Sequence, residues 1–324
     1  MAFDIENKLV IAIASSAVLT LDAARDAFRE HGLEAYRKYQ REHQHDVLEK
    51  GPAFAFVKRL LNFNRLFPEQ QPVEVVLVSH NDSDTGLRIM NSLKAYDLDI
   101  SRAAFITQES PYRYLDAYNA SLFLSKNSKD VEAAIRNGYA AGTVLPSTLN
   151  DDPEDDSLRV AFDFDGVLAD PSSEMIYKGK GLAGFHQAEA KRAEIPCAPG
   201  PLADLFRKLS GLRELEFERC QHDPSYRRRL SLSIVTARSA PAHERVVSTL
   251  RKWNITTDQT FFLGGVNKGR ILSALRPHIF FDDQEHPHLD AARDYTPSVH
   301  IPIGCAFGPS EPESHSPEQG EQAK

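Results

Sequence analysis

The sequence predicts an α/β protein in which one parallel-sheet unit, with helices on both faces, occurs twice in tandem. Three observations predict this class: short apolar runs alternate with amphipathic stretches, residues recur at fixed offsets, and reactive side chains follow the apolar runs. Strands that alternate with helices favour a parallel sheet covered on both faces. Ligands of such sheets lie at the carboxyl ends of the strands.

The composition is that of a soluble globular protein. The 324 residues suggest two domains of ordinary size, with 41% hydrophobic and 26% charged residues. The net charge of −8 argues against a broad nucleic-acid-binding surface. A small anionic substrate stays compatible with it, because a metal and a few local cations can offset the overall field. Cys197, Cys220 and Cys305 show no metal-ligand spacing and are interpreted as free thiols in a reducing compartment.

The apolar run Leu9–Leu19 could be taken for an export signal. Asp4 and Glu6 precede it, whereas a signal peptide has a basic start. The run is also too short to span a bilayer. We therefore predict a buried first strand in a cytoplasmic protein without a membrane partner. The tail, residues 308–324, is rich in Pro, Ser, Glu and Gln and is predicted to be disordered.

The rear part of a folding unit recurs along the chain at one offset. The strand-like run Val75–Ser79 is repeated by Leu232–Thr236, an offset of 157 residues (79 to 236). Self-similarity at a fixed offset is the sequence signature of repeated units. With no gap, the same offset pairs Arg88 with Arg245, Leu93 with Leu250, Tyr96 with Trp253, Phe105 with Phe262, Phe123 with Phe280, and Ala134 with Ala291.

The front part recurs at a shorter offset of 149 residues (51 to 200). The difference implies eight extra residues in the second copy, which we place near Cys220 to Tyr226. A fixed offset on each side of a single insertion favours tandem duplication. The matching segments are Gly51-Pro52 and Gly200-Pro201, Gly32-Leu33 and Gly181-Leu182, Tyr36 and Phe185, and Ser16–Leu19 and Asp165–Leu168.

These offsets divide the chain into a first repeat, residues 1–150, and a second repeat, residues 151–307. Each repeat is predicted to run strand, helical insert, strand, helix, strand, helix. Val160–Phe164 is typical of a short buried strand, whereas Ala242–Trp253 has helical periodicity. An insert from about Pro171 to Tyr226 separates the first two strands of the second repeat.

Reactive side chains follow the strand-like runs of the second repeat. Converging carboxylates need a cation, and Mg²⁺ fits because it takes oxygen ligands and keeps waters that a phosphate can displace. An Asp can attack phosphorus to form an aspartyl-phosphate, while a hydroxyl and a Lys hold the phosphoryl oxygens. The residues are Asp163 and Asp165 after the first run, Thr236, Ala237 and Arg238 at the second, Lys268 in a later loop, and Asp282 and Asp283 at the last.

This ordered set resembles the motifs of the haloacid dehalogenase (HAD) superfamily of phosphohydrolases: D-x-D-x-V, a strand-terminal Thr, a Lys and a paired Asp. One D-x-D alone would be weak evidence, but all of these motifs in order at strand ends are specific. The resemblance implies a tandem duplication of a HAD-like, Rossmannoid parallel sheet with a helical cap insert.

A narrower resemblance, to the cytosolic type I 5′-nucleotidases, runs from about Lys8 to Gly304. That family dephosphorylates nucleoside 5′-monophosphates, AMP prominently, with Mg²⁺, so we expect the same substrates and cofactor. Phe164 and Gly166 depart from the family's pattern, which has a smaller residue and Ala there; this bears on the substrate and not on the chemistry. The matching segments are Asp163–Asp165, Ser173-Glu174, Gly200–Leu202, Val235–Arg245, Phe262–Gly265, Phe280–Gln284 and, in the first repeat, Asp84–Arg88.

The resemblance implies a role for each motif. Asp163 would be the nucleophile, and Asp165 would protonate the leaving ribose oxygen and then activate water. Thr236 would bind phosphate through its hydroxyl and nearby backbone N–H groups, such as that of Ala237, at a helix start. A Thr there could instead serve as a helix N-cap. Lys268 would balance charge between phosphate and Asp163, or could be a solvated loop lysine.

A magnesium site would be completed by Asp163, Asp282, Asp283 and the backbone carbonyl of Asp165. Asp283 is favoured as the direct ligand, because the second Asp of the pair usually has that role in the superfamily. Arg238 could orient the carboxylates, reach the phosphate or form an ordinary salt bridge.

The insert would act as a cap that closes over the substrate and excludes water. Tyr177 and Phe185 could stack a purine or could be core residues. His186 and Glu189 could contact ribose or could lie solvated on a helix face.

The first repeat lacks this chemistry, so we expect it to be catalytically inactive. Its polar run from Ser79 to Arg88 could bind a nucleotide through Asn81, Asp84, Thr85 and Arg88, as an ADP or ATP effector or as part of the substrate site. The run could equally be a capped helix start with a solvated turn. Ala14 and Ser16 stand where the second repeat has Asp163 and Asp165, Pro111 where it has Lys268, and Ser125 and Lys126 where it has Asp282 and Asp283.

The leading hypothesis is a cytoplasmic, Mg²⁺-dependent nucleoside 5′-monophosphate phosphohydrolase that acts through an aspartyl-phosphate on Asp163. Two hypotheses stay open beside it: a phosphatase for a sugar phosphate or another small phosphoester, and a nucleotide-sensing binding protein without turnover. We expect the repeats to pack with pseudo-twofold symmetry, by analogy with symmetric dimers, and a homo-oligomer could form.

Overall fold

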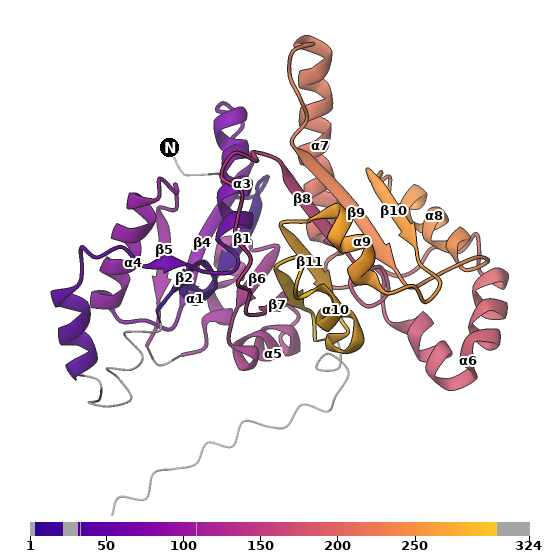
Figure 1. Ribbon diagram of the computed structural model, residues 1–324, viewed down its shortest axis with the longest axis horizontal. Helices are drawn as coiled ribbons and strands as arrows, with labels where there is room; N and C mark the ends of the chain where they lie inside the picture. Colours follow the sequence, from indigo (N-terminus) through magenta and orange to yellow (C-terminus); the bar gives the residue numbers. More distant parts are fainter. Residues whose placement is uncertain (1–3, 22–31, 33, 108, 303–324) are drawn as a thin grey trace, which may run out of the picture.

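The computed structural model describes residues 4–21, 32, 34–107 and 109–302 (Figure 1). A ten-stranded sheet forms its centre, with helices on both faces. Cys197 and Cys220 are free thiols, whereas Cys305 and residues 308–324 lie outside the described residues. Within the described ranges, no helix has the length and apolar character needed to cross a membrane.

Most strand residues are buried, as expected of parallel strands covered by helices on both faces. The first repeat contributes β1 (Leu9–Ile13), β4 (Val73–Ser79), β5 (Arg102–Phe105), β6 (Leu122–Ser125) and β7 (Ala141–Val144). The second contributes β8 (Leu158–Phe162), β9 (Leu230–Thr236), β10 (Gln259–Phe262), β11 (Ile279–Asp282) and β12 (Ser298–His300). Their order across the sheet is β10-β9-β8-β11-β12-β7-β6-β1-β4-β5.

The strands of the second repeat begin at the positions that the two sequence offsets predict. The shorter offset relates the start of β8 to that of β1 (9 to 158). The longer offset relates each later strand to its counterpart (73 to 230, 102 to 259, 122 to 279 and 141 to 298). Neighbouring strands within each repeat are parallel, and both repeats have one strand order. The predicted duplication of a parallel α/β sheet is therefore confirmed.

β7 and β12 join the two repeats as an antiparallel pair. Thr143 pairs with His300, and Val144 pairs with Val299. Thr143 and His300 are equivalent positions, since the longer offset relates them (143 to 300), so a local twofold axis passes between them. The two half-sheets consequently direct the carboxyl ends of their strands to opposite edges of the sheet.

Equivalent helices cover the same face of the sheet (Figure 1). One face carries α3 (Phe54–Leu66) and α7 (Ala203–His222) at its centre, with α4 (Ser83–Ala95) and α8 (His243–Lys252) toward the ends. The other face carries α5 (Ser128–Arg136), α9 (Lys268–Leu275) and α10 (Asp290–Ala292). The predicted layers, with helices on both faces, are thus present.

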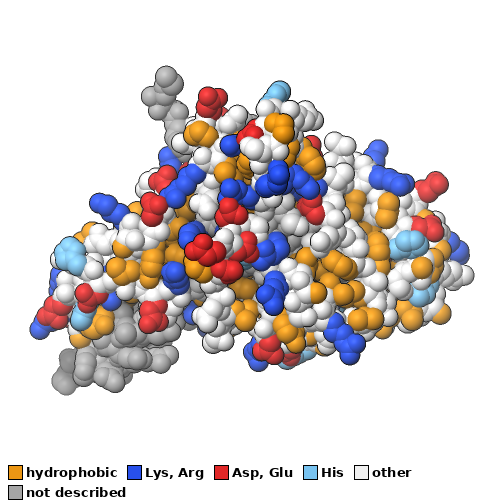
Figure 2. Space-filling model, turned by 45° about the horizontal axis from the view of Figure 1, so that its top comes forward, with side chains coloured by type: hydrophobic (Ala, Val, Ile, Leu, Met, Phe, Trp, Pro, Cys, Tyr) orange, Lys and Arg blue, Asp and Glu red, His pale blue; other side chains and the backbone are white. Residues whose placement is uncertain are grey.

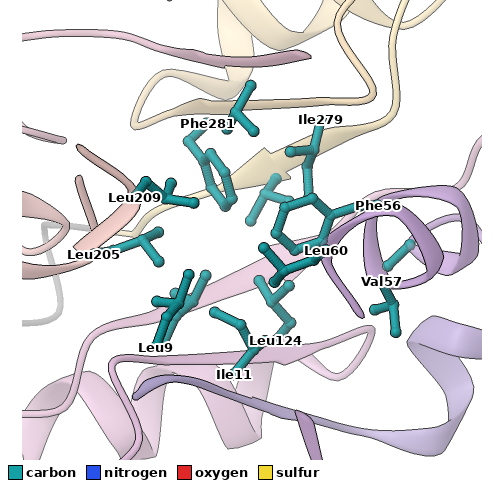
Figure 3. Packing of buried hydrophobic residues seen from close by; sticks show 14 of the residues in the cluster. Leu9, Ile11, Phe56, Val57, Leu60, Leu124, Leu205, Leu209, Ile279 and Phe281 are labelled. Atoms are coloured by element: carbon teal, nitrogen blue, oxygen red, sulfur yellow. The ribbon is translucent and has the colours of Figure 1, made fainter. Parts of the chain in front are cut away.

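A hydrophobic cluster beneath α3 and α7 crosses the junction between the repeats (Figure 3). Phe56 and Leu60 of α3 and Leu205 and Leu209 of α7 come together there over Phe281 of β11. Residues four positions apart lie on one face of a helix, which directs both pairs inward. Full burial of one such side chain stabilises the fold by about 1.5–3 kcal/mol. The two repeats therefore share a core.

The matched Gly-Pro pairs mark a close approach of two backbones in each repeat. A Cβ at Gly51 would lie 2.7 Å from the carbonyl oxygen of Ala17, and one at Gly200 would lie 2.5 Å from that of Ala169. No side chain fits at such distances, so both repeats need glycine just before α3 or α7, where the chain passes the segment that follows the first strand.

The predicted cap insert divides into two different parts. α6 (Ser172–Lys191), bent at Gly181 where φ is +66°, lies beside the sheet at the outer end of the second repeat (Figure 1). α7 instead packs buried leucines on the sheet, because it is the counterpart of α3 (54 to 203). The cap is therefore smaller than predicted and ends before Ala203.

α7 also accommodates most of the inserted residues. The end of α3 corresponds to Leu215 (66 to 215), whereas α7 continues to His222, about two further turns. The insertion thus lies just before and at the predicted segment from Cys220 to Tyr226. The short elements are α1 (Ser15–Val18), β2 (Leu19–Thr20), β3 (Glu49–Lys50), the 3₁₀ helices η1 (Pro111–Tyr114) and η2 (Asp116–Tyr118), and the π-helical turn η3 (Glu285–Leu289).

The first strand is buried, as the sequence predicts. The apolar run Leu9–Leu19 forms β1 and α1 and enters β2, and β1 is a buried central strand as predicted. On the face shown in Figure 2, Asp and Glu side chains are interspersed with Lys and Arg.

Candidate active site

The predicted reactive groups of the second repeat meet at the carboxyl ends of three strands. Asp163 directly follows β8, Thr236 is the last residue of β9, and Asp282 is the last residue of β11. The backbone N–H of Asp163 donates to the carbonyl of Phe281 at 2.8 Å, which holds the first and last motifs together. Parallel strands end at one edge, so residues far apart in sequence become neighbours.

Lys268 is the cation at the centre of the site. Its Nζ lies 3.0 Å from Asp163 Oδ2 and 2.6 Å from Asp282 Oδ2, and its side chain is 2% exposed. The alternative of a solvated loop lysine is therefore wrong. Burial alone would lower the pKa of Lys268, but the two carboxylates outweigh it and raise that pKa.

Local backbone geometry brings Lys268 into this position. Lys268 is the first residue of α9, and the Asn267 side chain caps the helix by accepting the N–H of Gly269 at 2.8 Å. A Cβ at Gly269 would lie 2.3 Å from the carbonyl oxygen of Ala291. Only glycine permits this close approach, so Gly269 allows the start of α9 to reach the site.

Both carboxylate oxygens of Asp282 have partners within the protein. Its Oδ1 accepts the backbone N–H of Gln284 at 2.9 Å and lies 3.1 Å from Nδ1 of His288, while Oδ2 binds Lys268. Burial raises the pKa of Asp282, but Lys268 and His288 outweigh it and hold that pKa below its ordinary value. The sequence analysis missed His288, since a lone histidine six residues after Asp282 carries no recognisable signal.

Asp163 and Asp283 are carboxylates without sufficient counter-charge. Burial raises the pKa of Asp163 to about 7, against the pull of Lys268 and with the repulsion of Asp282. Burial and the nearby Asp163, Asp282 and Glu174 raise the pKa of Asp283 to about 9. Oδ1 of Asp283 is buried and has no hydrogen-bond partner among the described residues. The site can therefore accept a further cation on this side.

The donor set fits Mg²⁺ at Asp163 and Asp283. Asp163, Asp282 and His288 offer ligand atoms within 4.8 Å of one another. The Lys268 ammonium, however, already serves as the cation of that group through Asp282. The oxygens of Asp163 and Asp283, one of them orphaned, are the hard donors that Mg²⁺ prefers.

Arg238 pairs with Asp165, which fits two of its three predicted alternatives, orienting a carboxylate and forming an ordinary salt bridge. Nη2 of Arg238 lies 2.6 Å from Oδ1 of Asp165, and Nε lies 2.7 Å from Oδ2, a bidentate pair. The remaining nitrogen, Nη1, binds Glu189. Arg238 is thereby committed to two carboxylates rather than aimed at a phosphate.

The surroundings of Thr236 differ from the prediction. Its side chain is buried and Oγ1 accepts the backbone N–H of Arg238 at 3.2 Å. α8 begins only at His243, so the predicted helix start at Thr236, and with it the N-cap alternative, is wrong. Ala237 is exposed at the start of the connecting loop.

The four residues predicted to lie in the cap differ in their surroundings. Phe185 is buried, 5.5 Å from the guanidinium carbon of Arg238, so the core alternative describes it. Tyr177 is half-exposed and packs edge-on against Phe185 at 6.2 Å, and His186 lies beside the same ring. Both predicted alternatives for Glu189 are wrong, because its side chain is 0% exposed and binds Arg238 and Arg245.

Phe164, which departs from the family's pattern, points into the core. Its side chain is fully buried in the cluster beneath α7, and its ring lies 5.2 Å from the guanidinium carbon of Arg238. Gly166 has φ of +74°, a conformation that favours glycine. The departure therefore affects packing behind Arg238.

The polar run of the first repeat is a capped helix start. Asp82 caps α4 by accepting the N–H of Thr85 at 2.9 Å, and Asp84 binds Arg41. Thr85, Arg88 and Asn81 are buried. Asn81 donates to the hydroxyls of Ser15 and Ser79 at 2.8 Å, and Arg88 donates to Gln40 and to the carbonyl of Asp46.

This run does not line the Asp163 site, because the antiparallel junction directs the carboxyl ends of the two repeats to opposite edges. The backbone geometry of the inactive site is nevertheless preserved. Ala14 N–H donates to Leu124 at 2.8 Å, as Asp163 N–H does to Phe281. The first repeat keeps the scaffold and lacks the reactive side chains.

A cavity of about 960 Å³ lies apart from the reactive groups, between the linker that follows β7 and the amino ends of β8 and β11. Lys50, Arg159, Arg276, Asp151 and Asp294 are among its lining residues. The mixed charge gives no preference for a phosphate. We therefore locate the chemistry at Asp163, where the titrating carboxylates and Lys268 meet.

Comparison with known proteins agrees with this geometry. The sequence model of the 5′-nucleotidase family matches residues 1–307. The chain is 35% identical over 298 residues to human "Cytosolic 5′-nucleotidase 1B", covering 89% of this chain and 48% of that protein, so it spans about half the length of this relative. A solved structure, that of histidinol dehydrogenase from Elizabethkingia anophelis, matches over 92% of this chain and 74% of that chain. The identity is 7% and the TM-score is 0.20, so this match carries no argument.

Proposed function

Because the chain belongs to the 5′-nucleotidase family, we propose that it is a phosphoric monoester hydrolase that removes phosphate from nucleoside 5′-monophosphates. One observation carries the proposal: Asp163 lies at a strand end against the buried Lys268, in the setting a phosphoryl-accepting carboxylate needs. The human relative is named a cytosolic 5′-nucleotidase, which supports a cytoplasmic location for this chain.

The reaction begins with attack of Asp163 on phosphorus. A bond forms between a carboxylate oxygen and phosphorus, and the bond from phosphorus to the ribose oxygen breaks. Asp165 gives a proton to that leaving oxygen, and the nucleoside departs. Arg238 holds Asp165 through both carboxylate oxygens, which fixes its place, and one of these two contacts must open for Asp165 to carry that proton.

Hydrolysis of the aspartyl-phosphate completes the cycle. Water attacks phosphorus, Asp165 takes the proton of that water, and the bond to Asp163 breaks to release inorganic phosphate. Lys268 and Thr236 face the same strand ends and would stabilise the negative phosphoryl oxygens. Ala14 and Ser16 offer no such groups in the first repeat, which we propose is inactive.

Asp163, Asp283 and the backbone carbonyl of Asp165 would hold Mg²⁺. When bound, Mg²⁺ neutralises charge on the carboxylates and on the phosphoryl oxygens. Asp282 acts differently: it anchors Lys268 and is itself held by His288.

We expect Mg²⁺ to stabilise the protein more at pH 8 than at pH 6. Folding raises the pKa values of Asp163 and Asp283 from 3.8 to about 7 and about 9, so without metal each group reduces stability as pH rises from the ordinary value to the raised one. Protons compete with the cation at low pH. At a hundredfold excess over Kd, Mg²⁺ should add about 2.7 kcal/mol. Thermal unfolding with and without Mg²⁺ measures the difference.

The control for this prediction is Asp283→Asn, which removes the orphaned carboxylate. We expect the variant to lose most of the Mg²⁺-dependent shift in Tm at pH 8. An equal shift in the variant, or equal shifts of the unaltered protein at both pH values, would contradict magnesium binding at Asp283.

A substrate panel in Mg²⁺ tests the proposed activity. Purine and pyrimidine nucleoside monophosphates, their deoxy forms and several sugar phosphates are compared by released phosphate. We expect the nucleoside monophosphates to be preferred. Preference for a sugar phosphate would assign another phosphatase, and tight nucleotide binding without phosphate release would assign a binding protein. Repeating the panel with ADP and ATP tests the proposed effector, and sedimentation tests a homo-oligomer.

A further inference from the structure

A buried series of charges links the cap helix α6 to Asp165. Glu189, near the end of α6, binds Nη1 of Arg238 through Oε2. Its other oxygen, Oε1, lies 2.9 Å from Nη1 of Arg245 on α8 and accepts the Ser173 hydroxyl at 2.9 Å. Glu189, Arg238 and Arg245 are 0%, 3% and 5% exposed, so water cannot take the place of these contacts.

Glu189 controls the direction in which Arg238 presents its bidentate edge. The guanidinium is planar and rigid, so binding one nitrogen constrains the plane and the other two donors. With Nη1 held by Glu189 and by the carbonyl of Ala242 at 3.3 Å, the Nε–Nη2 edge faces Asp165. The rings of Phe164 and Phe185 lie within 5.2 and 5.5 Å of the guanidinium carbon and restrict its movement further.

The first repeat shows what this position requires when there is no reaction to support. The counterparts of Asp165, Glu189, Arg238 and Arg245 are Ser16, Gln40, Asn81 and Arg88 (16 to 165, 40 to 189, 81 to 238 and 88 to 245). Gln40 still accepts from Arg88 at 3.2 Å, and both side chains are buried. A neutral glutamine thus suffices to join the two helices.

The charge of Glu189 therefore has a purpose other than joining α6 to α8. Desolvating a carboxylate is unfavourable, so a link that glutamine can make gives no structural reason to bury one. The carboxylate occurs in the repeat where an arginine must be held against Asp165, and an uncharged amide occurs where that arginine is replaced by Asn81.

We propose that Glu189 is a positioning residue for the proposed nucleotidase reaction. By holding Arg238, it fixes the place of the Asp165 carboxyl group, which serves the leaving ribose oxygen once one of its two contacts with Arg238 opens. The inference rests on the proposed function, and it concerns proton delivery to the leaving group rather than binding of phosphate.

The test compares two leaving groups in Glu189→Gln. A ribose oxygen leaves poorly without a proton, whereas the nitrophenolate of p-nitrophenyl phosphate leaves without one. General acid catalysis is worth about 10²–10⁴-fold, so a misdirected Asp165 should lower kcat/KM for the preferred nucleoside monophosphate by roughly 10–100-fold. The aryl phosphate should lose less than about threefold, because kcat/KM excludes the later hydrolysis step.

Matched variants separate positioning from stability. Gln40→Ala removes the equivalent contact in the first repeat and should lower Tm while leaving kcat/KM for both substrates unchanged. Glu189→Asp keeps the charge but shortens its reach; it should fold if Glu189→Gln does not, and should give a smaller loss with the same selectivity for the nucleoside monophosphate.

The outcomes are distinguishable. Equal losses for both substrates, or no loss for either, would overturn the role of Glu189 and leave it a structural residue. Failure of the unaltered protein to hydrolyse any nucleoside monophosphate would instead refute the proposed function, before a variant is made.

Discussion

Asp163→Asn is expected to reduce turnover of nucleoside monophosphates by about 10⁴-fold or more, because the attacking carboxylate is lost and no neighbouring group can form the covalent intermediate. The amide keeps the size of the side chain. The variant should remain folded, since Lys268 retains its 2.6 Å contact with Asp282.

The Tm of this variant serves as its control, because it separates a loss of chemistry from a loss of folding. Burial holds the pKa of Asp163 at about 7, so the ionised group costs stability above that pH. Asp163→Asn should therefore have a Tm at pH 8 equal to or above that of the unaltered protein. Asp84→Asn, which breaks a surface pair with Arg41 in the first repeat, should change neither activity nor Tm appreciably. Residual turnover within tenfold of the unaltered protein would exclude the aspartyl-phosphate mechanism.

Lys268→Met should destabilise the protein by about 3–5 kcal/mol, the usual cost of removing one partner from a buried ion pair. Two carboxylates, Asp163 and Asp282, would lose the ammonium that lies 3.0 and 2.6 Å from them. Turnover should also fall by at least about 10²-fold, because a preorganised cation no longer faces the phosphoryl oxygens.

The loss of stability in Lys268→Met should depend on pH. Without the ammonium, the pKa of Asp163 rises further above its value in the unfolded chain, and the pKa of Asp282 loses the main counter-charge that holds it below its ordinary value. Groups with raised pKa values bind more protons in the folded state, so stability falls as pH increases through the range between the two values. We expect a larger deficit at pH 8 than at pH 5, measured by denaturant unfolding.

A surface lysine provides the comparison. Lys38→Met removes an exposed pair with Glu42 and should change stability by less than about 0.5 kcal/mol at either pH. A deficit of Lys268→Met that is small, or equal at pH 5 and pH 8, would mean that Lys268 does not compensate buried charge.

The duplication explains why the predicted reactive groups lie at one edge of the ten-stranded sheet. The antiparallel pairing of β7 with β12 gives each repeat its own carboxyl edge, on opposite sides. Ala14 stands at the position of the proposed nucleophile at one edge, and Asn81, Ser15 and Ser79 form mutual hydrogen bonds nearby. A nucleotide effector, if one binds, must use other contacts than the buried Asn81, Thr85 and Arg88.

Short-range sequence patterns predicted much of the fold and of the candidate site. The two fixed offsets predicted the tandem repeat and where the strands of its second copy begin (9 to 158 and 73 to 230). Asp163, Thr236 and Asp282 could be found because each lies at the end of an apolar run, and the ends of parallel strands share an edge. These three come together for that reason, which needs no knowledge of side-chain packing, whereas Lys268 reaches them from the start of α9.

Only the tertiary structure shows which carboxylate pairs with which cation. Glu189 and Arg238 are 49 positions apart and Arg238 and Asp165 are 73 apart. Nothing within a short window indicates that such residues touch. The saturation of Asp282 by Lys268 and His288, the orphaned oxygen of Asp283, and the opposed edges of the two repeats depend in the same way on long-range contacts. Charges buried from water are set by partners brought close in space, whereas a strand end is set by its neighbours in the chain.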